Sequence, residues 1–204
     1  MQERPEPEPA PRPRRGRGRR PIGEVRADVV EAAGGLLLDG GMGAFTIEAV
    51  AERAGVSKTT IYKWWPSKGA LALDGYFHAV EPALAFPDSH DLEADLTAQL
   101  RAFVRVLTGT PAGRVIAELI GQAQTDPELS AALLERYSGP RRELAVQRMR
   151  RAQADGQLRP DVDPEVLVDQ LWGACYHRLL MPGLPVTEEF ATSLIANLLR
   201  GVRT

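Results

Sequence analysis

The 204-residue sequence predicts an all-α protein, with an N-terminal three-helix domain and a larger helical C-terminal domain. From Ile22 onward, apolar residues recur at helical spacing nearly everywhere, and no convincing alternating pattern indicates a strand. Serine, threonine or aspartate precedes several of these periodic segments, as helix N-caps do. The composition, with 44% hydrophobic and 25% charged residues, is that of an ordinary globular chain.

Residues 1–21 contain almost nothing apolar: prolines alternate with charged residues and lead into the string R-R-G-R-G-R-R-P. Such a segment cannot bury enough apolar surface to fold, so we expect a disordered, partly extended arm. Within it, G-R-G-R-R-P loosely resembles the AT-hook core, whose arginines lie in an A·T-rich minor groove. Arg17, Arg19 and Arg20 are therefore candidate DNA contacts, with a merely solubilising tail as the alternative.

The first helix of the domain predicted over residues 22–66 runs from Gly23 to Asp39 and ends at Gly40-Gly41. Its apolar residues form one stripe along the helix. Gly34 and Gly35 each weaken it by about 1 kcal/mol relative to alanine, so this helix must rely on packing.

Two short helices follow, each with its own start signal. Thr46 can cap a helix over residues 47–54, with Gly55 as its left-handed terminator. Ser57 can cap the next, over residues 58–64.

A connecting helix is predicted within residues 67–86. Pro66 disfavours helical geometry at Trp65 and so stops the preceding helix, after which Ser67 caps a helix that runs to about Leu84.

Longer helices fill residues 87–204. Two of them begin with an aspartate cap, a proline and a glutamate, at Asp126-Pro127-Glu128 and at Asp163-Pro164-Glu165. The last helix begins at Thr187 and carries a wide apolar stripe close to the C-terminus.

The segment from Thr46 to Leu71, T-I-E-A-V-A-E-R-A-G-V-S-K-T-T-I-Y-K-W-W-P-S-K-G-A-L, has the anatomy of a helix-turn-helix. Its second helix exposes threonine hydroxyls and lysine ammonium groups, which suit the base edges and phosphates of a major groove. All three lysines of the protein, Lys58, Lys63 and Lys68, lie here at a spacing of five. The segment is therefore the candidate DNA reader.

The string A-x-x-A-G-V-S-x-x-T-x-Y-x-x-(aromatic)-x-S-K-x-x-L closely resembles the DNA-binding domain of the TetR family of transcriptional regulators. The resemblance implies a homodimeric repressor that binds an inverted-repeat operator on double-stranded DNA and is released by a small-molecule effector. Lys63 and Trp64 depart from the histidines or other aromatic residue of many members, which leaves the operator sequence open. The family's base and phosphate contacts fall on Thr46, Ser57, Lys58, Thr59, Thr60, Tyr62, Lys63, Trp64 and Lys68.

In the C-terminal domain, the resemblance places dimerisation on the last two helices, around residues 166–180 and 187–199, with packing in the core of the monomer as the alternative for their apolar stripes. Gly173 and Ala174 would allow two helices to approach closely there. Candidate effector contacts are polar or aromatic residues on otherwise apolar helices, with core packing as the alternative for each: Phe103, Gln122, Tyr137, Met149, Trp172, Cys175, Tyr176 and His177. A ligand-independent regulator, an activator and a nonspecific architectural DNA binder are the alternative functions.

The sequence argues against an enzyme, a metal site and a membrane protein. Cys175 and His177 are two residues apart on one helix and point about 160° from each other, so they cannot pair as nucleophile and base. One cysteine and three scattered histidines offer neither a disulfide nor a zinc site, and no cofactor is implied. No stretch approaches the roughly 18 apolar residues of a membrane span. We expect a cytoplasmic protein that associates with the nucleoid when bound to DNA.

Overall fold

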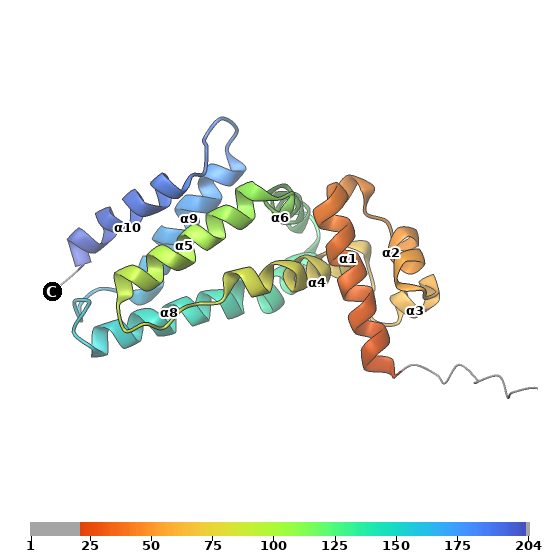
Figure 1. Ribbon diagram of the computed structural model, residues 1–204, viewed down its shortest axis with the longest axis horizontal. Helices are drawn as coiled ribbons and strands as arrows, with labels where there is room; N and C mark the ends of the chain where they lie inside the picture. Colours follow the sequence, from red (N-terminus) through yellow and green to blue (C-terminus); the bar gives the residue numbers. More distant parts are fainter. Residues whose placement is uncertain (1–20, 203–204) are drawn as a thin grey trace, which may run out of the picture.

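The computed structural model describes residues 21–202, and this part of the chain is helical without a strand. Helices α1 to α3 lie at one end of an elongated molecule, helices α5, α8, α9 and α10 extend toward the other end, and α4 runs between the two parts, while α6 lies beside α1 (Figure 1). The predicted arm, with Arg17, Arg19 and Arg20, lies outside the described residues. The helices in chain order are α1 (Ile22–Ala44), α2 (Ile47–Ala54), α3 (Lys58–Tyr62), α4 (Lys68–Val80), η1 (Glu81–Leu84), α5 (Leu92–Gly109), α6 (Ala112–Ala123), α7 (Pro127–Leu133), η2 (Leu134–Ser138), α8 (Gly139–Ala154), α9 (Pro164–Leu180) and α10 (Glu188–Val202).

Buried apolar side chains from all ten α-helices of the described chain form one continuous core. The predicted all-α fold, with an N-terminal helix-turn-helix domain and a helical C-terminal domain, is therefore confirmed. Within residues 21–202, no helix has both the length and the apolar character that crossing a membrane requires.

Helix α1 changes direction at Gly41, where the sequence predicted its end. Gly41 has φ 67° and ψ −172°, a conformation that glycine adopts readily and other residues do not. One further helical turn follows the kink and reaches Ala44, so the predicted boundary at Gly40-Gly41 is a bend inside a longer helix.

The close crossing of α1 and α4 explains the Gly34-Gly35 pair, which by propensity alone only weakens α1. A Cβ atom built at Gly34 would lie 2.7 Å from the carbonyl oxygen of Gly75 in α4. A Cβ atom built at Gly75 would lie 2.7 Å from the Cβ of Ala33 and 2.9 Å from the backbone nitrogen of Gly34. Two glycines that face each other let the backbones of α1 and α4 touch, so packing offsets the lost helix propensity.

We expect Gly75→Ala to lower the free energy of unfolding by about 1–3 kcal/mol, because the added methyl group would force two backbones apart. Urea denaturation monitored by circular dichroism measures this loss. The matched control is Gly43→Ala in α1, where the added Cβ meets nothing within 4 Å and stability should stay constant or rise slightly. Equal stability of the two variants would contradict the close crossing.

Helix α4 continues into a 3-10 turn instead of staying α-helical to Leu84 as predicted. Pro82 lies in the first turn of η1 and has no N–H to donate to the carbonyl of His78, so the α-helical hydrogen-bond pattern cannot continue. The connection still ends at Leu84, whose side chain is buried. This end of the connection lies against the C-terminal helices.

Most helix starts follow the predicted caps. Asp126 accepts hydrogen bonds from the backbone nitrogens of Glu128 and Leu129, and Asp163 accepts one from Glu165. The hydroxyl of Thr187 accepts from the backbone nitrogen of Phe190 at 3.1 Å. Local hydrogen bonds of this kind depend on a few adjacent residues and can be recognised in the sequence.

Candidate nucleic-acid interface and effector cavity

Helices α2 and α3 form a tight helix-turn-helix. Gly55 ends α2 with φ 65° and ψ 39°, the left-handed conformation that turns the chain toward α3. Ala51 and Ala54 are buried at the crossing, and Ile61 anchors α3 with 0% exposure. The small alanine side chains let α3 lie close to α2, so its opposite face is presented to solvent.

Thr46 and Ser57, two of the predicted DNA contacts, cap these helices. The Thr46 hydroxyl accepts a hydrogen bond from the backbone nitrogen of Ala49 at 3.0 Å, which fixes the start of α2. The Ser57 hydroxyl accepts from the backbone nitrogen of Thr60 at 3.1 Å and lies 2.9 Å from the Thr60 hydroxyl. These side chains therefore set the geometry of the reading helix.

Thr59, Tyr62 and Lys63 present exposed side chains on α3 and the residue that follows it. The Tyr62 side chain is 54% exposed, which is high for a large ring on a folded surface. Within the described chain, Thr59 and Lys63 form no side-chain hydrogen bond or ion pair, so both are available to a partner. This group of three is the candidate reading surface.

The other two lysines are held by neighbours. Lys58 Nζ donates to Glu48 Oε1 at 2.9 Å, and this hydrogen bond lowers the pKa of Glu48 and raises that of Lys58. Lys68 Nζ donates to the carbonyl of Met42 at 3.4 Å and lies 5.9 Å from the centre of the Phe45 ring. Both ammonium groups remain exposed, so an incoming phosphate can compete for them.

We expect Glu48→Gln to strengthen DNA binding about two- to fivefold and to steepen its dependence on salt, because Lys58 becomes free for a phosphate. Fluorescence anisotropy titrations at several salt concentrations measure both effects. Glu52→Gln removes an equal charge from the same helix without freeing a lysine, and should change affinity less. Equal DNA affinities of the two variants would show that Glu48 does not compete with a DNA phosphate for Lys58.

Trp64 and Trp65 differ in their surroundings although they are adjacent. Trp64 is half-buried and packs edge-to-face on Trp65, with ring centroids 5.7 Å apart. Trp65 is 0% exposed, and its Nε1 donates to Asp74 Oδ2 at 2.8 Å. Helix α3 ends at Tyr62, two residues before the predicted end at Trp64. Lys63 and Trp64 instead form a hydrogen-bonded turn. Trp65 thereby joins the base of the reading helix to α4.

Asp74 of α4 connects three parts of the molecule. Besides Trp65, it pairs with Arg136 of η2 at 3.0 Å and with Arg26 of α1 at 3.5 Å. Its side chain is only 15% exposed, so these partners supply much of its solvation. Asp74 was not among the predicted site residues, because nothing in its local pattern indicates partners 9, 48 and 62 residues away.

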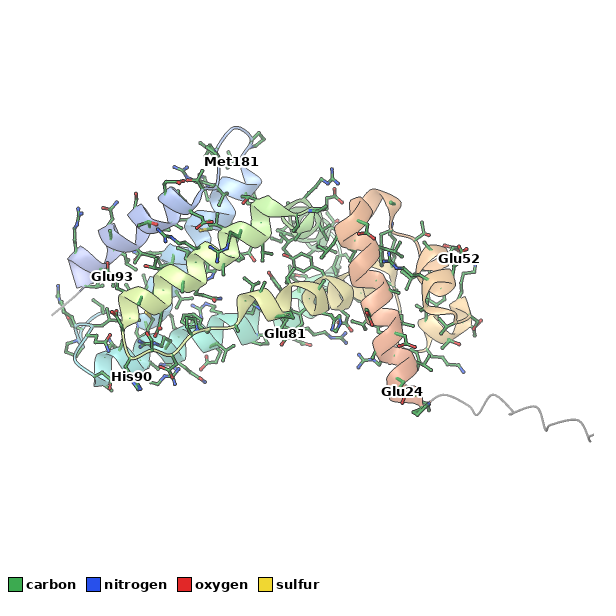
Figure 2. All side chains as sticks on the ribbon, viewed as in Figure 1. Glu24, Glu52, Glu81, His90, Glu93 and Met181 are labelled. Carbon is green, nitrogen blue, oxygen red and sulfur yellow. The ribbon has the colours of Figure 1, made fainter. Side chains whose placement is uncertain are left out.

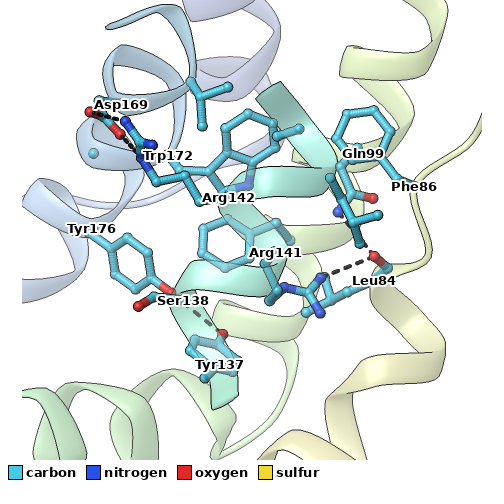
Figure 3. A pocket seen from close by; sticks show the side chains of 15 residues that line it. Leu84, Phe86, Gln99, Tyr137, Ser138, Arg141, Arg142, Asp169, Trp172 and Tyr176 are labelled. Carbon is cyan, nitrogen blue, oxygen red and sulfur yellow. Dashed lines mark hydrogen bonds and ion pairs between the residues drawn. The ribbon is translucent and has the colours of Figure 1, made fainter. Parts of the chain in front are cut away.

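A cavity of about 350 Å³ lies between the end of the α4–η1 connection and helices α5, α8 and α9 (Figure 3). This volume is within the range of about 300–1,000 Å³ typical of small-molecule sites. Four of the eight predicted effector contacts line it: Phe103, Tyr137, Trp172 and Tyr176.

The other four predicted effector contacts do not line this cavity. Gln122 and His177 are exposed, whereas Met149 and Cys175 are core residues with 1% and 0% exposure. Burial raises the pKa of the Cys175 thiol to about 11, so the thiol stays protonated at neutral pH and is poorly nucleophilic.

Two polar residues of the cavity wall, Gln99 and Arg141, were not predicted from the sequence. Their side-chain nitrogens both donate to the carbonyl oxygen of Leu84, at 3.1 Å from Gln99 and 3.0 Å from Arg141. The sequence did contain an indication of Gln99, because it is a polar residue within the apolar, buried stripe of α5 beside Leu100 and Phe103. The cavity wall is thus bonded directly to the end of the α4–η1 connection.

A buried ion pair fixes α5 against α8, the two helices that carry Gln99 and Arg141. Arg148 Nε lies 2.8 Å from Asp95 Oδ2, and both residues are 1% exposed. Burial opposes the charge on Asp95, but hydrogen bonds from Ser89 and Arg148 outweigh it and hold the pKa of this carboxyl below its usual range. The pair therefore fixes the position of α8 relative to α5 in the wall of the cavity.

The exposed helix-turn-helix is the arrangement of a DNA-binding protein, and comparison with known sequences identifies the family. The profile described as "Bacterial regulatory proteins, tetR family" matches residues 29–74. The profile described as "Tetracyclin repressor-like, C-terminal domain" matches residues 86–198. The chain belongs to the TetR family of DNA-binding transcriptional regulators, which are transcription factors and not enzymes.

Two curated relatives extend over most of the chain. The HTH-type transcriptional regulator YdeS of Bacillus subtilis is 36% identical over 175 residues, which cover 86% of this chain and 88% of YdeS. The DNA-binding transcriptional repressor TetR of Mycobacteroides abscessus is 29% identical over 181 residues, which cover 87% of this chain and 93% of that protein.

Solved structures agree with this assignment. The TetR family transcription regulator SCO0332 is 62% identical, with a TM-score of 0.83 over 89% of this chain and 100% of that one. The flavonoid-responsive regulator FrrA is 25% identical, with a TM-score of 0.61 over 89% of this chain and 98% of that one. Members of the family bind DNA and typically act as dimers.

Proposed function

We propose that this protein is a homodimeric transcriptional repressor that binds an inverted-repeat operator and leaves it when a small molecule fills the cavity. The observation that carries the proposal is that the α4–η1 connection is bonded both to the helix-turn-helix and to the cavity wall. Asp74 is bonded to Trp65 behind the reading helix, and the Leu84 carbonyl is bonded to Gln99 and Arg141 in the cavity wall. A relative named as a repressor and another named as flavonoid-responsive support the two halves of the proposal.

The proposed DNA contacts are the exposed groups of α3 and its flanks. Thr59 and Tyr62 face base edges and the adjacent backbone, and Lys63 and Lys68 bind phosphates. Thr46 and Ser57 act as caps that orient the two helices. A single short helix offers too few contacts for a tight site, so two copies engage half-sites roughly 34 Å or a multiple of it apart.

The proposed dimer surface is the outer face of α9 and the start of the α9–α10 connection. Val166 and Leu180 are 50% and 43% exposed and lie on one stripe of α9, together with Gly173, whose Cβ position is open. Met181 is also exposed, at the edge of the molecule (Figure 2). The same face also exposes Gln170 and His177, and a face that mixes exposed apolar and polar side chains in this way suits a self-complementary two-fold contact.

We expect the double variant Val166→Glu, Leu180→Glu to be a folded monomer, because it places four charges in a two-fold contact while altering half-exposed positions. Sedimentation velocity measures the mass, and anisotropy should show at least a hundredfold weaker operator binding because only one half-site is engaged at a time. The control Leu134→Glu, at a 63% exposed position in η2, should stay dimeric. A variant that remains dimeric would place the contact elsewhere.

Effector release requires that the ligand bind one conformer better than the other. A ligand that takes the hydrogen bond from Arg141 competes with the Leu84 carbonyl and so loosens the end of the α4–η1 connection. Movement of α4 then reaches α3 through Asp74 and Trp65. A coupling of about 1–3 kcal/mol is typical of such systems and corresponds to roughly 5- to 150-fold in DNA affinity.

Selection of bound fragments from a random DNA pool tests the DNA-binding part of the proposal. We expect an inverted repeat that is retained in excess competitor DNA, and a reporter gene placed behind that repeat should be silenced by the protein. Enrichment of no sequence would favour the architectural alternative. Activation of the reporter would show that the protein is an activator and not a repressor.

A further inference from the structure

The walls of the cavity are aromatic on several sides. The rings of Phe86 and Trp172 have centroids 6.2 Å apart, and Phe103 packs edge-to-face on Tyr176 with centroids 5.4 Å apart. Tyr137 and Tyr176 place their hydroxyl oxygens 3.4 Å from each other, opposite the end that holds Leu84 (Figure 3). Aromatic rings attract other rings beyond the effect of area burial alone, so these walls favour a flat conjugated ligand.

Gln99 supplies a buried acceptor with no partner in the described chain. Its side chain is 4% exposed, and its Nε2 is committed to the Leu84 carbonyl at 3.1 Å. Reversing the amide would set two oxygens against each other, so the orientation is fixed and Oε1 is left without a hydrogen bond. An unpaired buried acceptor is costly, and a ligand hydroxyl in the cavity would satisfy it.

Arg141 supplies an uncompensated positive charge at the same end of the cavity. One of its nitrogens donates to Leu84, and the guanidinium carbon lies 5.9 Å from the centre of the Tyr137 ring. Among residues 21–202 it has no carboxylate partner, whereas the neighbouring Arg142 is paired with Asp169 at 2.8 Å and Glu165 at 3.1 Å. The arginines of the wall therefore leave one positive charge to be neutralised.

We propose that the effector is a planar aromatic monoanion that carries its anionic oxygen and a hydroxyl donor on one polar edge. The anion faces Arg141, the hydroxyl donates to Gln99 Oε1, and the ring system lies among Trp172 and the other aromatic side chains. The inference rests on the proposed function, because it names the chemistry of the ligand for the same cavity. A single free charge favours a carboxylate or a phenolate over a phosphate dianion.

Isothermal titration calorimetry of the full chain with three related naphthalenes tests the proposal. The probe 4-hydroxy-2-naphthoate has both groups, 2-naphthoate lacks the hydroxyl, and methyl 4-hydroxy-2-naphthoate lacks the charge. We expect the first to bind most tightly and the absence of either group to weaken binding about tenfold. Equal binding of all three, or tighter binding of dodecanoate than of any naphthalene, would overturn the proposal.

Two cavity variants assign the groups to their partners. In Gln99→Leu the two naphthoates should bind alike, and in Arg141→Met the acid and its ester should bind alike. If Gln99→Leu does not fold, Gln99→Met has a similar shape and gives the same comparison. Gln122→Leu and Arg150→Met alter exposed residues outside the cavity and should preserve the full discrimination. Discrimination that survives in both cavity variants would contradict the assignment.

Calorimetry without DNA separates this inference from the proposed function. If the naphthoates bind as expected but no operator is selected, the repressor proposal fails and the ligand chemistry stands. If an operator is selected and an aliphatic compound releases the protein while the naphthoates do not bind, the ligand chemistry fails and the repressor proposal stands.

Discussion

The double variant Thr59→Ala, Tyr62→Ala is expected to bind the selected operator at least a hundredfold more weakly than the parent protein, with an unchanged melting temperature. Both side chains are exposed, so their removal leaves the core intact. Each specific contact to a base or its flanking backbone contributes about 1–3 kcal/mol, and a dimer makes every contact twice. Anisotropy titration with labelled operator, together with thermal denaturation, measures both quantities.

Two further variants show whether this weakening reflects sequence reading. Thr108→Ala alters an exposed threonine on α5 and should bind DNA as the parent does. Lys63→Ala should weaken operator and random DNA by similar factors, and the slope of log affinity against log salt should become shallower by about 0.9 for each phosphate that is no longer neutralised. Unchanged operator affinity in the double variant would remove α3 as the reading helix.

Asp74→Ala is expected to lower the free energy of unfolding by about 2 kcal/mol and to weaken the response of DNA binding to the effector. The substitution leaves the Nε1 of the fully buried Trp65 without its acceptor and separates Arg136 of η2 from α4. Urea denaturation gives the stability, and operator affinity measured with and without a bound effector gives the coupling.

Asp74→Asn separates the two roles of this residue. The asparagine oxygen can still accept from Trp65, so much of the stability should return, while the charge that attracts Arg136 and Arg26 is gone. We therefore expect a stable protein with a reduced effector response. A full effector response in both variants would show that coupling between the domains does not pass through Asp74.

The helix-turn-helix was predictable because its determinants are local. The caps at Thr46, Ser57 and Ser67 and the left-handed Gly55 depend on residues within a few positions of each other, and all four are present in the structure as predicted. Hydrogen bonds across three residues and backbone preferences at single positions are encoded in short strings. The helical spacing of apolar residues likewise predicted the all-α fold.

The candidate site was predictable only in part. Aromatic residues on apolar helices are visible in the sequence, and half of the predicted effector contacts line the cavity, among them Trp172 and Tyr176. The same pattern selected Met149 and Cys175, which are core residues, because an interior position and a cavity wall have similar compositions.

The sequence by itself determined the helices, their caps and the exposed chemistry of α3, since each of these depends on neighbours along the chain. Only the tertiary structure decided that Gly34 meets Gly75, that Asp74 joins Trp65 to Arg136, and that Gln99 and Arg141 share the Leu84 carbonyl. These contacts join residues from 9 to 62 positions apart. Their geometry is set by how whole helices cross, and side-chain spacing within one helix carries no information about a partner on another.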